Sequence, residues 1–186
     1  LVDTVMGYAQ IRYTNVFAGA KEQRYYSASG DAVNSVDGYH LRACRYQTLG
    51  KLESEAYYDV DGNPVTLSSG YASRRYQYSL TGKLEATYLY DAQGSAITNA
   101  GYAAEQSQYD ENGRRTARQY VDGTGALVTL SEGYAQIAYE YDDRDRVTRE
   151  TFLDAQGQPV VCTDGYASVR REYDARGNVC AMRYLD

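Results

Sequence analysis

The sequence predicts an all-β protein in which tandem β-hairpin repeats stack into an elongated twisted sheet or an open β-solenoid. Three observations lead to this fold class. A Gly-Tyr pair recurs every 31 or 32 residues along the 186-residue chain. Glycine also returns about every 12 residues within each repeat, after an Asp-containing phrase. The segments between the glycines are about eight residues long, which suits strands and is too short for stable helices.

The Gly-Tyr pair marks the start of each of six homologous units, the sixth incomplete. We read the chain as a single repeat array, 1-186, with units 7-37, 38-69, 70-100, 101-132, 133-164 and 165-186. Positions within a unit are counted from this glycine as offset zero. The opening pairs are Gly7-Tyr8, Gly38-Tyr39, Gly70-Tyr71, Gly101-Tyr102, Gly133-Tyr134 and Gly165-Tyr166.

Two further glycines predict two tight turns in each unit. Offset twelve is Gly in five units and Asp145 in the fifth, and another Gly follows at offset 23 or 24. An Asp commonly begins the same phrase, as in Tyr173-Asp174-Ala-Arg-Gly177. An Asp carboxylate accepts backbone N–H bonds at the start of a turn, and Gly adopts the positive φ that closes it.

In the segments on either side of the first turn, apolar and polar residues alternate as they do in the strands of a β-hairpin. In the fifth unit Ala135, Ile137, Tyr139 and Tyr141 would lie on one face, with Gln136, Ala138 and Glu140 on the other. Pairing the Tyr of offset eight with offset fourteen would place the apolar columns at offsets fourteen and twenty on one face. Those columns are Leu52, Leu84, Val147 and Val179, and Tyr58, Tyr90, Val121, Leu153 and Leu185.

A short third strand is expected after the third glycine, at Pro64-Val65 and Pro159-Val160-Val161, because proline is tolerated at the start of a strand. A helical-hairpin solenoid of similar period is the rival architecture. The frequent turn signals and the many Tyr, Val and Thr residues favour strands. A closed propeller is disfavoured because its blades need about 40 residues.

The composition limits both the kind of hydrophobic core that the chain can form and the classes of partner that it can bind. Leu, Val, Ile and Phe make up about a sixth of the chain, which is low for a globular core. The 22 tyrosines, with no Trp, supply the apolar surface instead. The formal charge of −6 disfavours nucleic acid as a partner, because phosphate binding needs a clustered basic surface. No apolar run is long enough to span a membrane.

Residues that often carry chemistry are few. Cys44, Cys162 and Cys180 occupy different repeat positions, so we interpret them as incidental, with a Cys162–Cys180 disulfide left open. His40 is the only histidine and stands where the other units have Ala. The phrase from Asp59 to Asn63 begins like a calcium loop but lacks its closing Glu. We therefore expect no metal, no cofactor and no enzyme, while a glycosidase-like carboxylate pair stays open.

The candidate ligand-binding column is the Tyr after each opening glycine. It lies near offset nineteen, which holds Tyr26, Tyr57, Tyr120, Phe152 and Tyr184. One interpretation is an aromatic ladder that packs the repeats together. The other is an exposed strip of rings that stacks on sugars, formed by Tyr8, Tyr39, Tyr71, Tyr102, Tyr134 and Tyr166.

Three phrases resemble the YD or RHS-type repeat of large bacterial surface and secreted proteins: YDENGRR at 109–115, YDDRDRV at 141–147 and YDARGNV at 173–179. The resemblance implies β-hairpins that wind into extended sheets and shells, in an exported bacterial protein. Some members of that family have been linked to carbohydrate binding. The period of 31 or 32 residues and the opening Gly-Tyr-Ala depart from the family pattern.

These observations predict a non-enzymatic bacterial module, extracellular or at the cell surface, that acts as a scaffold or adhesive interaction surface. The alternative is a module that binds carbohydrate or cell-wall glycan through the repeated tyrosines. Its protein or glycan ligand is not identified by the sequence. The chain begins at Leu1 and its sixth unit stops early, so we expect a piece of a longer protein, with self-association through sheet edges or chain ends.

Overall fold

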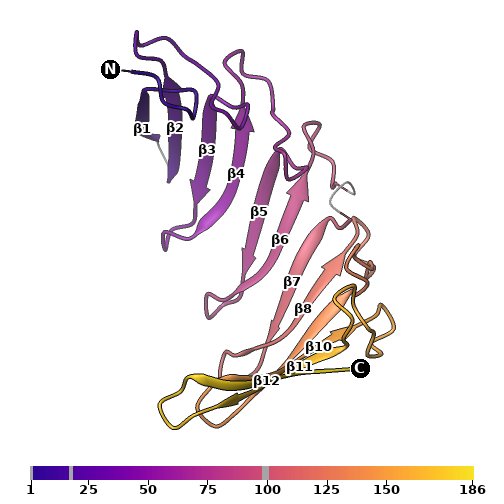
Figure 1. The fold of residues 1–186 in the computed structure, drawn as a ribbon. Helices are drawn as coiled ribbons and strands as arrows, with labels where there is room; N and C mark the ends of the chain where they lie inside the picture. Colours follow the sequence, from indigo (N-terminus) through magenta and orange to yellow (C-terminus); the bar gives the residue numbers. More distant parts are fainter. Residues whose placement is uncertain (1, 17–18, 98–100) are drawn as a thin grey trace. The chain divides into compact units, whose positions relative to one another are not determined.

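The computed structural model describes residues 2–16, 19–97 and 101–186 and contains twelve β-strands joined as six hairpins (Figure 1). No helix occurs among these described residues, and so none that could cross a membrane. The strands are β1 (Gln10–Val16), β2 (Ala20–Tyr26), β3 (Leu41–Tyr46), β4 (Leu52–Tyr58), β5 (Ser73–Tyr78), β6 (Leu84–Tyr90), β7 (Ala104–Tyr109), β8 (Arg115–Val121), β9 (Gln136–Tyr141), β10 (Val147–Leu153), β11 (Ser168–Tyr173) and β12 (Val179–Leu185).

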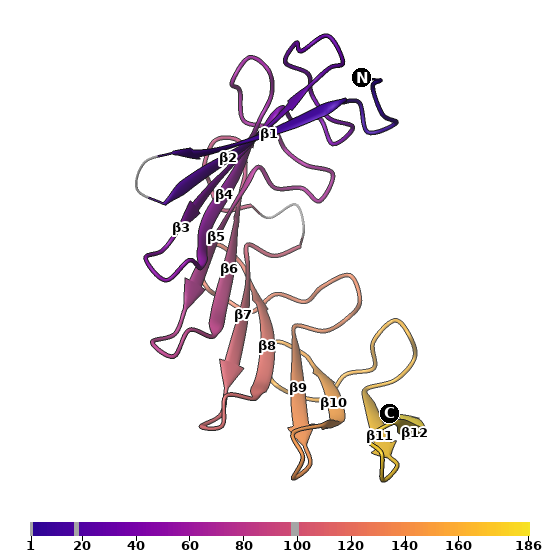
Figure 2. The ribbon, with the colours of Figure 1, turned by 90° about the vertical axis from the view of Figure 1, so that its left-hand side faces the viewer.

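The chain divides into two compact units, Leu1–Gln77 with Thr87–Ala100, and Tyr78–Ala86 with Gly101–Asp186. In the first, β1 to β5 pair with their neighbours in chain order, and in the second β7 to β12 do the same (Figure 2). All of these pairings are antiparallel, and the sheet is open in each unit. The predicted all-β fold of hairpins stacked side by side is confirmed.

A β-bulge in four of the hairpins sets which side chains face the core. Tyr141 pairs with Val147 as expected, but the register then shifts by one residue, and Ile137 lies opposite Phe152. Leu153, at offset twenty, lies opposite Gln136 on the other face. The prediction that offsets fourteen and twenty share a face is therefore wrong. The extra residue of the bulge reverses the alternation.

The turns have the predicted chemistry. The Asp142 carboxylate accepts the backbone N–H groups of Arg144 and Arg146, each at 3.0 Å. Asp145 has a φ of 60°, the one positive φ at a non-glycine residue in the described chain, at the position where the other units have Gly. An Asp side chain tolerates this left-handed conformation better than most.

At five of the opening glycines the described residues form a third turn that the sequence analysis did not predict. The opening glycine closes it: the Gly165 N–H donates to the Cys162 carbonyl at 2.9 Å, with a φ of 89°. Gly38 does the same with Ser35 at 2.9 Å. The opening glycine is therefore a turn residue as well as the marker of the period.

The expected third strand is wrong. Pro64 and Pro159 each form only an isolated bridge, to Tyr58 and Leu153. The N–H of the residue after each proline then bonds back to the preceding strand, as Val160 does to the Phe152 carbonyl at 3.0 Å. Proline has no N–H to extend a ladder, and the turn at the next opening glycine follows within a few residues.

The core in each unit is a thin layer dominated by aromatic rings. In the first unit Tyr25, Tyr39 and Tyr57 form its buried centre. In the second the centre consists of Ile137, Phe152, Cys162 and Val169, with Tyr134, Tyr139 and Tyr166 packed against it. Cys44, Cys162 and Cys180 are all free thiols, so the Cys162–Cys180 disulfide does not form.

Candidate functional site

The tyrosines after the opening glycines form continuous ladders with rings from the returning strands. In the first unit the ring centroids of Tyr8 and Tyr25 are 4.5 Å apart, and those of Tyr25 and Tyr39 are 5.5 Å apart. The ladder continues from Tyr39 to Tyr57 at 4.9 Å and to Tyr71 at 6.3 Å. These separations and the tilted or edge-on orientations are those that aromatic pairs prefer.

The second unit repeats the arrangement. Its successive centroid distances lie between 4.8 and 6.2 Å, along the series Tyr102, Tyr120, Tyr134, Phe152, Tyr166 and Tyr184. Every opening tyrosine of the six repeats thus contacts at least one ring of a neighbouring strand.

One predicted member of the ladder is wrong. Offset nineteen contributes Tyr57, Tyr120, Phe152 and Tyr184 as expected, but in the first repeat Tyr25 takes this place instead of Tyr26. The first hairpin pairs from Gln10↔Tyr26 to Val16↔Ala20 without a bulge, so it is one residue shorter. Tyr26 falls on the opposite face, where the Arg12 guanidinium lies 4.0 Å from its ring centroid.

Burial shows how these rings are used. Tyr39 and Tyr57 are only 9% and 5% exposed, and Tyr8, Tyr71, Tyr102, Tyr134 and Tyr166 are half-buried. Burial raises the pKa of Tyr57 to about 12, so its hydroxyl stays neutral at physiological pH. Ring faces that are covered by other rings favour packing over sugar stacking. The ligand-binding role of the column stays a prediction.

A second tyrosine column ties three of the described hairpins to the hairpin before each of them. The hydroxyls of Tyr109, Tyr141 and Tyr173, all at offset eight, donate to the carbonyls of Leu84, Arg115 and Val147 at 2.8, 2.9 and 2.7 Å. Sequence reasoning placed this column beside the turn and missed its bond. Its recurrence in five of six repeats was the available signal.

A buried ion cluster on the core face of the first unit was also missed. The Glu55 side chain is fully buried and accepts hydrogen bonds from Arg42 Nε at 2.8 Å, Arg74 Nε at 2.7 Å and the Tyr76 hydroxyl at 2.7 Å. Burial alone would raise the pKa of Glu55, but the bonds from Tyr76 and Arg42 and the charge of Arg74 lower it. Both of its oxygens are occupied, so the cluster is structural rather than catalytic.

The opposite face of the first unit's sheet has a groove of about 530 Å³. Strand register places its side chains in two rows. The first row is Ala20, Arg45, Ser54 and Arg75, and the second is Glu22, Ala43, Ala56 and Ser73. The small side chains form the floor, and Tyr58 and Tyr90 also line the groove.

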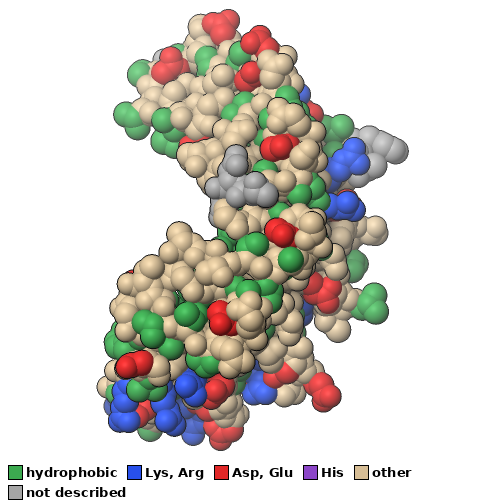
Figure 3. All heavy atoms as spheres, turned by 90° about the vertical axis from the view of Figure 1, so that its right-hand side faces the viewer, with side chains coloured by type: hydrophobic (Ala, Val, Ile, Leu, Met, Phe, Trp, Pro, Cys, Tyr) green, Lys and Arg blue, Asp and Glu red, His purple; other side chains and the backbone are tan. Residues whose placement is uncertain are grey.

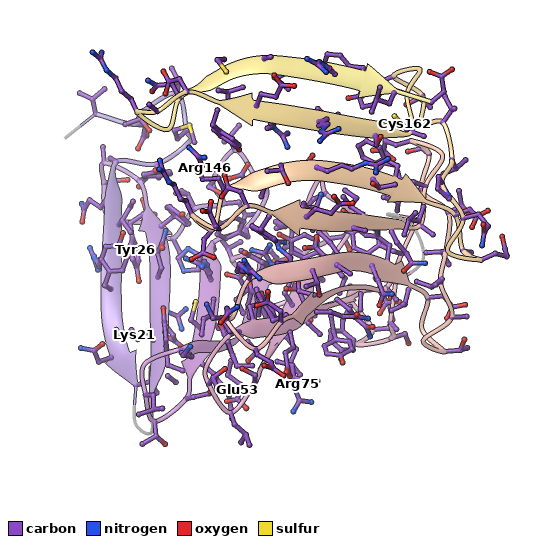
Figure 4. All side chains as sticks on the ribbon, turned by 90° about the horizontal axis from the view of Figure 1, so that it is seen from below. Lys21, Tyr26, Glu53, Arg75, Arg146 and Cys162 are labelled. Atoms are coloured by element: carbon purple, nitrogen blue, oxygen red, sulfur yellow. The ribbon has the colours of Figure 1, made fainter. Side chains whose placement is uncertain are left out.

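Three cations that line this groove, Arg45, Arg75 and Lys21, form no ion pair with a described residue, and Lys21 lies over the Tyr46 ring. Arg45 and Arg75 are exposed and form no ion pair with any described residue, whereas Arg42 and Arg74 on the other face bind Glu55. Figure 4 labels Arg75 and also Glu53, which falls at the bulge of β4. The groove therefore offers free guanidinium groups in a chain of net negative charge.

Metal-ligating and nucleophilic groups are dispersed. The described residues hold no group of three or more His, Cys, Asp or Glu side chains placed to bind a metal. The Asp59 carboxylate accepts the N–H groups of Asp61 and Asn63 at 3.0 and 2.8 Å, which is turn chemistry. His40 is 5% exposed, and its Nδ1 lies 3.2 Å from the Val33 carbonyl oxygen.

Comparison with known proteins assigns no family. No family model and no curated protein matches this chain. Among solved structures it is similar to the crystal structure of TcdB2-TccC3-TEV, at 15% identity and a TM-score of 0.21 over 92% of this chain and 12% of that one. It is also similar to ASR alternansucrase in complex with isomaltononaose, at 16% identity and a TM-score of 0.14 over 84% and 15%. The chain thus spans only a small part of either protein.

Proposed function

We propose that this chain is a non-enzymatic interaction module of a bacterial surface or secreted protein, in which the repeats are a scaffold and an open sheet face is the adhesive surface. One observation carries the proposal. The repeated side chains are engaged in the architecture itself, as ring ladders, hydroxyl tethers and turn carboxylates. What stays open to a partner is the face with the groove, where Arg45 and Arg75 occupy different repeat offsets.

The resemblance to YD or RHS-type repeats supports the exported location. Terminal strands support the expected self-association: Tyr13 on β1 is 73% exposed and Tyr184 on β12 is 56% exposed. Unpaired strand edges that carry apolar side chains promote pairing with other chains. We propose such edge pairing as a secondary mode of interaction.

The second candidate function is binding of carbohydrate or cell-wall glycan. It is favoured by the half-buried state of Tyr71, Tyr102, Tyr134 and Tyr166, which leaves part of each ring accessible. It is disfavoured by the neighbouring rings that cover their faces. A glycan on this column would therefore contact ring edges and hydroxyls.

The test is a binding screen of the purified chain against arrays of neutral glycans, acidic glycans, peptidoglycan fragments and extracellular-matrix proteins. We expect binding to at least one class, with the bound ligand recovered chemically unchanged. Binding that a Tyr134→Leu variant loses, while it keeps its melting temperature, would select the tyrosine column. Turnover of a glycan on the array, or binding to nothing, contradicts the proposed function.

A further inference from the structure

We propose that the groove of the first unit binds an anionic polysaccharide, whose carboxylate or sulfate group lies between Arg45 and Arg75 above Ser54. This inference deepens the proposed adhesive function and rests on it. It places the ligand on the sheet face opposite the tyrosine ladder.

The geometry is that of a two-armed anion clamp. Ser54 on β4 lies directly opposite Arg45 on β3 and Arg75 on β5. Adjacent strands are about 4.8 Å apart, so the two arginine backbones are about 10 Å apart with the serine hydroxyl between them. A guanidinium group binds a carboxylate or sulfate through two parallel N–H bonds, and two such groups converge from opposite sides on an anion at the centre.

The acidic side chains of the groove leave the guanidinium groups of Arg45 and Arg75 available to a bound anion. Glu22 also lines the groove, but Arg24 occupies its carboxylate at 2.8 Å. Glu55 borders it from the core side and is fully neutralised by Arg42 and Arg74. Arg45 on β3 and Arg75 on β5 carry like charges on either side of β4, and an anion bound between them would screen their repulsion.

The lining favours a sugar over a peptide or a nucleic acid. The rings of Tyr58 and Tyr90 supply apolar surface, and the hydroxyls of Ser54 and Ser73 are hydrogen-bonding groups suited to sugar hydroxyls. A volume of about 530 Å³ is that of a site for a small organic ligand. A peptide would instead add to a sheet edge, and the three free cations Lys21, Arg45 and Arg75 are too few to follow a phosphate backbone.

The second unit supplies a matched control. Arg170 occupies the same offset as Arg75, is exposed, and forms no ion pair with a described residue. Its neighbours Arg149 and Arg183 are paired with Glu140 and Glu172. Arg and Lys side chains, with acidic ones among them, gather at the lower end of Figure 3.

The experiment is calorimetric titration of the full chain with four probes of similar length: an oligogalacturonate, a sulfated galactan oligosaccharide, a neutral cello-oligosaccharide and oligoglutamate. We expect one or both acidic saccharides to bind, with affinity that falls as salt rises, and the neutral saccharide to bind at least tenfold more weakly. The comparison of carboxylated with sulfated probes identifies the anionic group.

Variants then assign the site. Arg45→Ala and Arg75→Ala should each weaken binding about tenfold, because each removes one bidentate contact, while Arg170→Ala should leave it within about twofold. Glu53→Gln should strengthen binding, since it removes an acidic side chain adjacent in sequence to Ser54 that forms no ion pair with a described residue. Equal melting temperatures of all variants establish that they fold, which is expected for exposed side chains.

Three outcomes overturn the inference. They are the absence of binding by either acidic saccharide, binding that is unaffected when both Arg45 and Arg75 are replaced, and binding of oligoglutamate as tight as that of the saccharides. In each case a neutral glycan or matrix protein bound in the array screen would leave the proposed adhesive function standing.

Discussion

At the scale of single residues, Glu55 shows how the fold holds a charge in its core. Its carboxylate has no exposure, and two arginines and a tyrosine hydroxyl surround it. Taking a carboxylate out of water costs several kcal/mol, which such a complete set of partners offsets. The cluster joins β3, β4 and β5 on the core face of the first unit.

The Glu55→Gln variant should lower the free energy of unfolding by about 3 kcal/mol, because it leaves the half-buried guanidinium groups of Arg42 and Arg74 without a counterion. Urea denaturation followed by circular dichroism measures the change. Glu150→Gln is the matched control at the same repeat offset. Its side chain is 27% exposed and forms one ion pair, with Arg171 at 3.1 Å, so a loss below about 1 kcal/mol is expected. Equal losses in the two variants would refute the structural role of the Glu55 cluster.

At the scale of the hairpin, the aromatic residues of the ladder pack through their rings. The tyrosines at offset eight instead donate their hydroxyls to backbone carbonyls of the preceding hairpin. Phe152 stands in the ladder where other repeats have tyrosine, so a hydroxyl is not needed there. Tyr141 instead donates its hydroxyl to the Arg115 carbonyl of the preceding hairpin. The two columns therefore respond differently to the same substitution.

Tyr120→Phe, in the ladder, should change the free energy of unfolding by less than about 0.5 kcal/mol, because no hydrogen bond of its hydroxyl is lost. Tyr141→Phe should cost about 0.5–1.5 kcal/mol, the usual worth of an intramolecular hydrogen bond. Chemical denaturation of both variants makes the comparison. A larger loss for Tyr120→Phe than for Tyr141→Phe would contradict the assignment of the two columns.

At the scale of the whole molecule, turn carboxylates recur in both units. The pKa values of Asp59, Asp110, Asp122, Asp142 and Asp174 are all lowered. That of Asp142 falls to about 2, through the Arg146 side chain and then its backbone N–H. Glu55 shifts in the same direction. The folded chain thus holds these groups ionised under acidic conditions.

Stability should therefore fall with acid. Because the folded-state pKa values lie below the unfolded ones, near 4, the stabilisation is complete above about pH 4 and disappears as the pH falls toward about 2. A far-UV circular dichroism titration should show loss of strand signal in that window. Asp142→Asn should make the pH dependence less steep. Unfolding that begins above pH 6 would mean that other groups dominate.

Much of the fold was predictable because its signals are local. The glycines that close the two predicted turns and the Asp residues that begin them act within five residues of sequence, as Asp142 and Asp145 show. The offset-eight to offset-fourteen pairing follows from turn length. The aromatic ladder was foreseen as one of two interpretations, although Tyr25 was missed because a bulge is absent from the first hairpin.

The groove and the ion cluster were not predictable, because they depend on register between neighbouring hairpins. Arg45 and Arg75 are 30 positions apart and occupy different repeat offsets. Only the pairing of both strands with β4 brings them onto one face with Ser54. Glu55 and Arg74 meet for the same reason, and nothing in either repeat alone indicates it.

The sequence by itself thus determined the strands, the two predicted turns and the chain order of the hairpins, since short-range backbone preferences and spacing specify them. The tertiary structure decided which face each side chain occupies after the bulge, which arginines are paired, and where the sheet face has a groove. The physical reason is that one added residue in a strand reverses the face of every residue beyond it. The position of such a bulge becomes known only when the pairing between neighbouring strands is known.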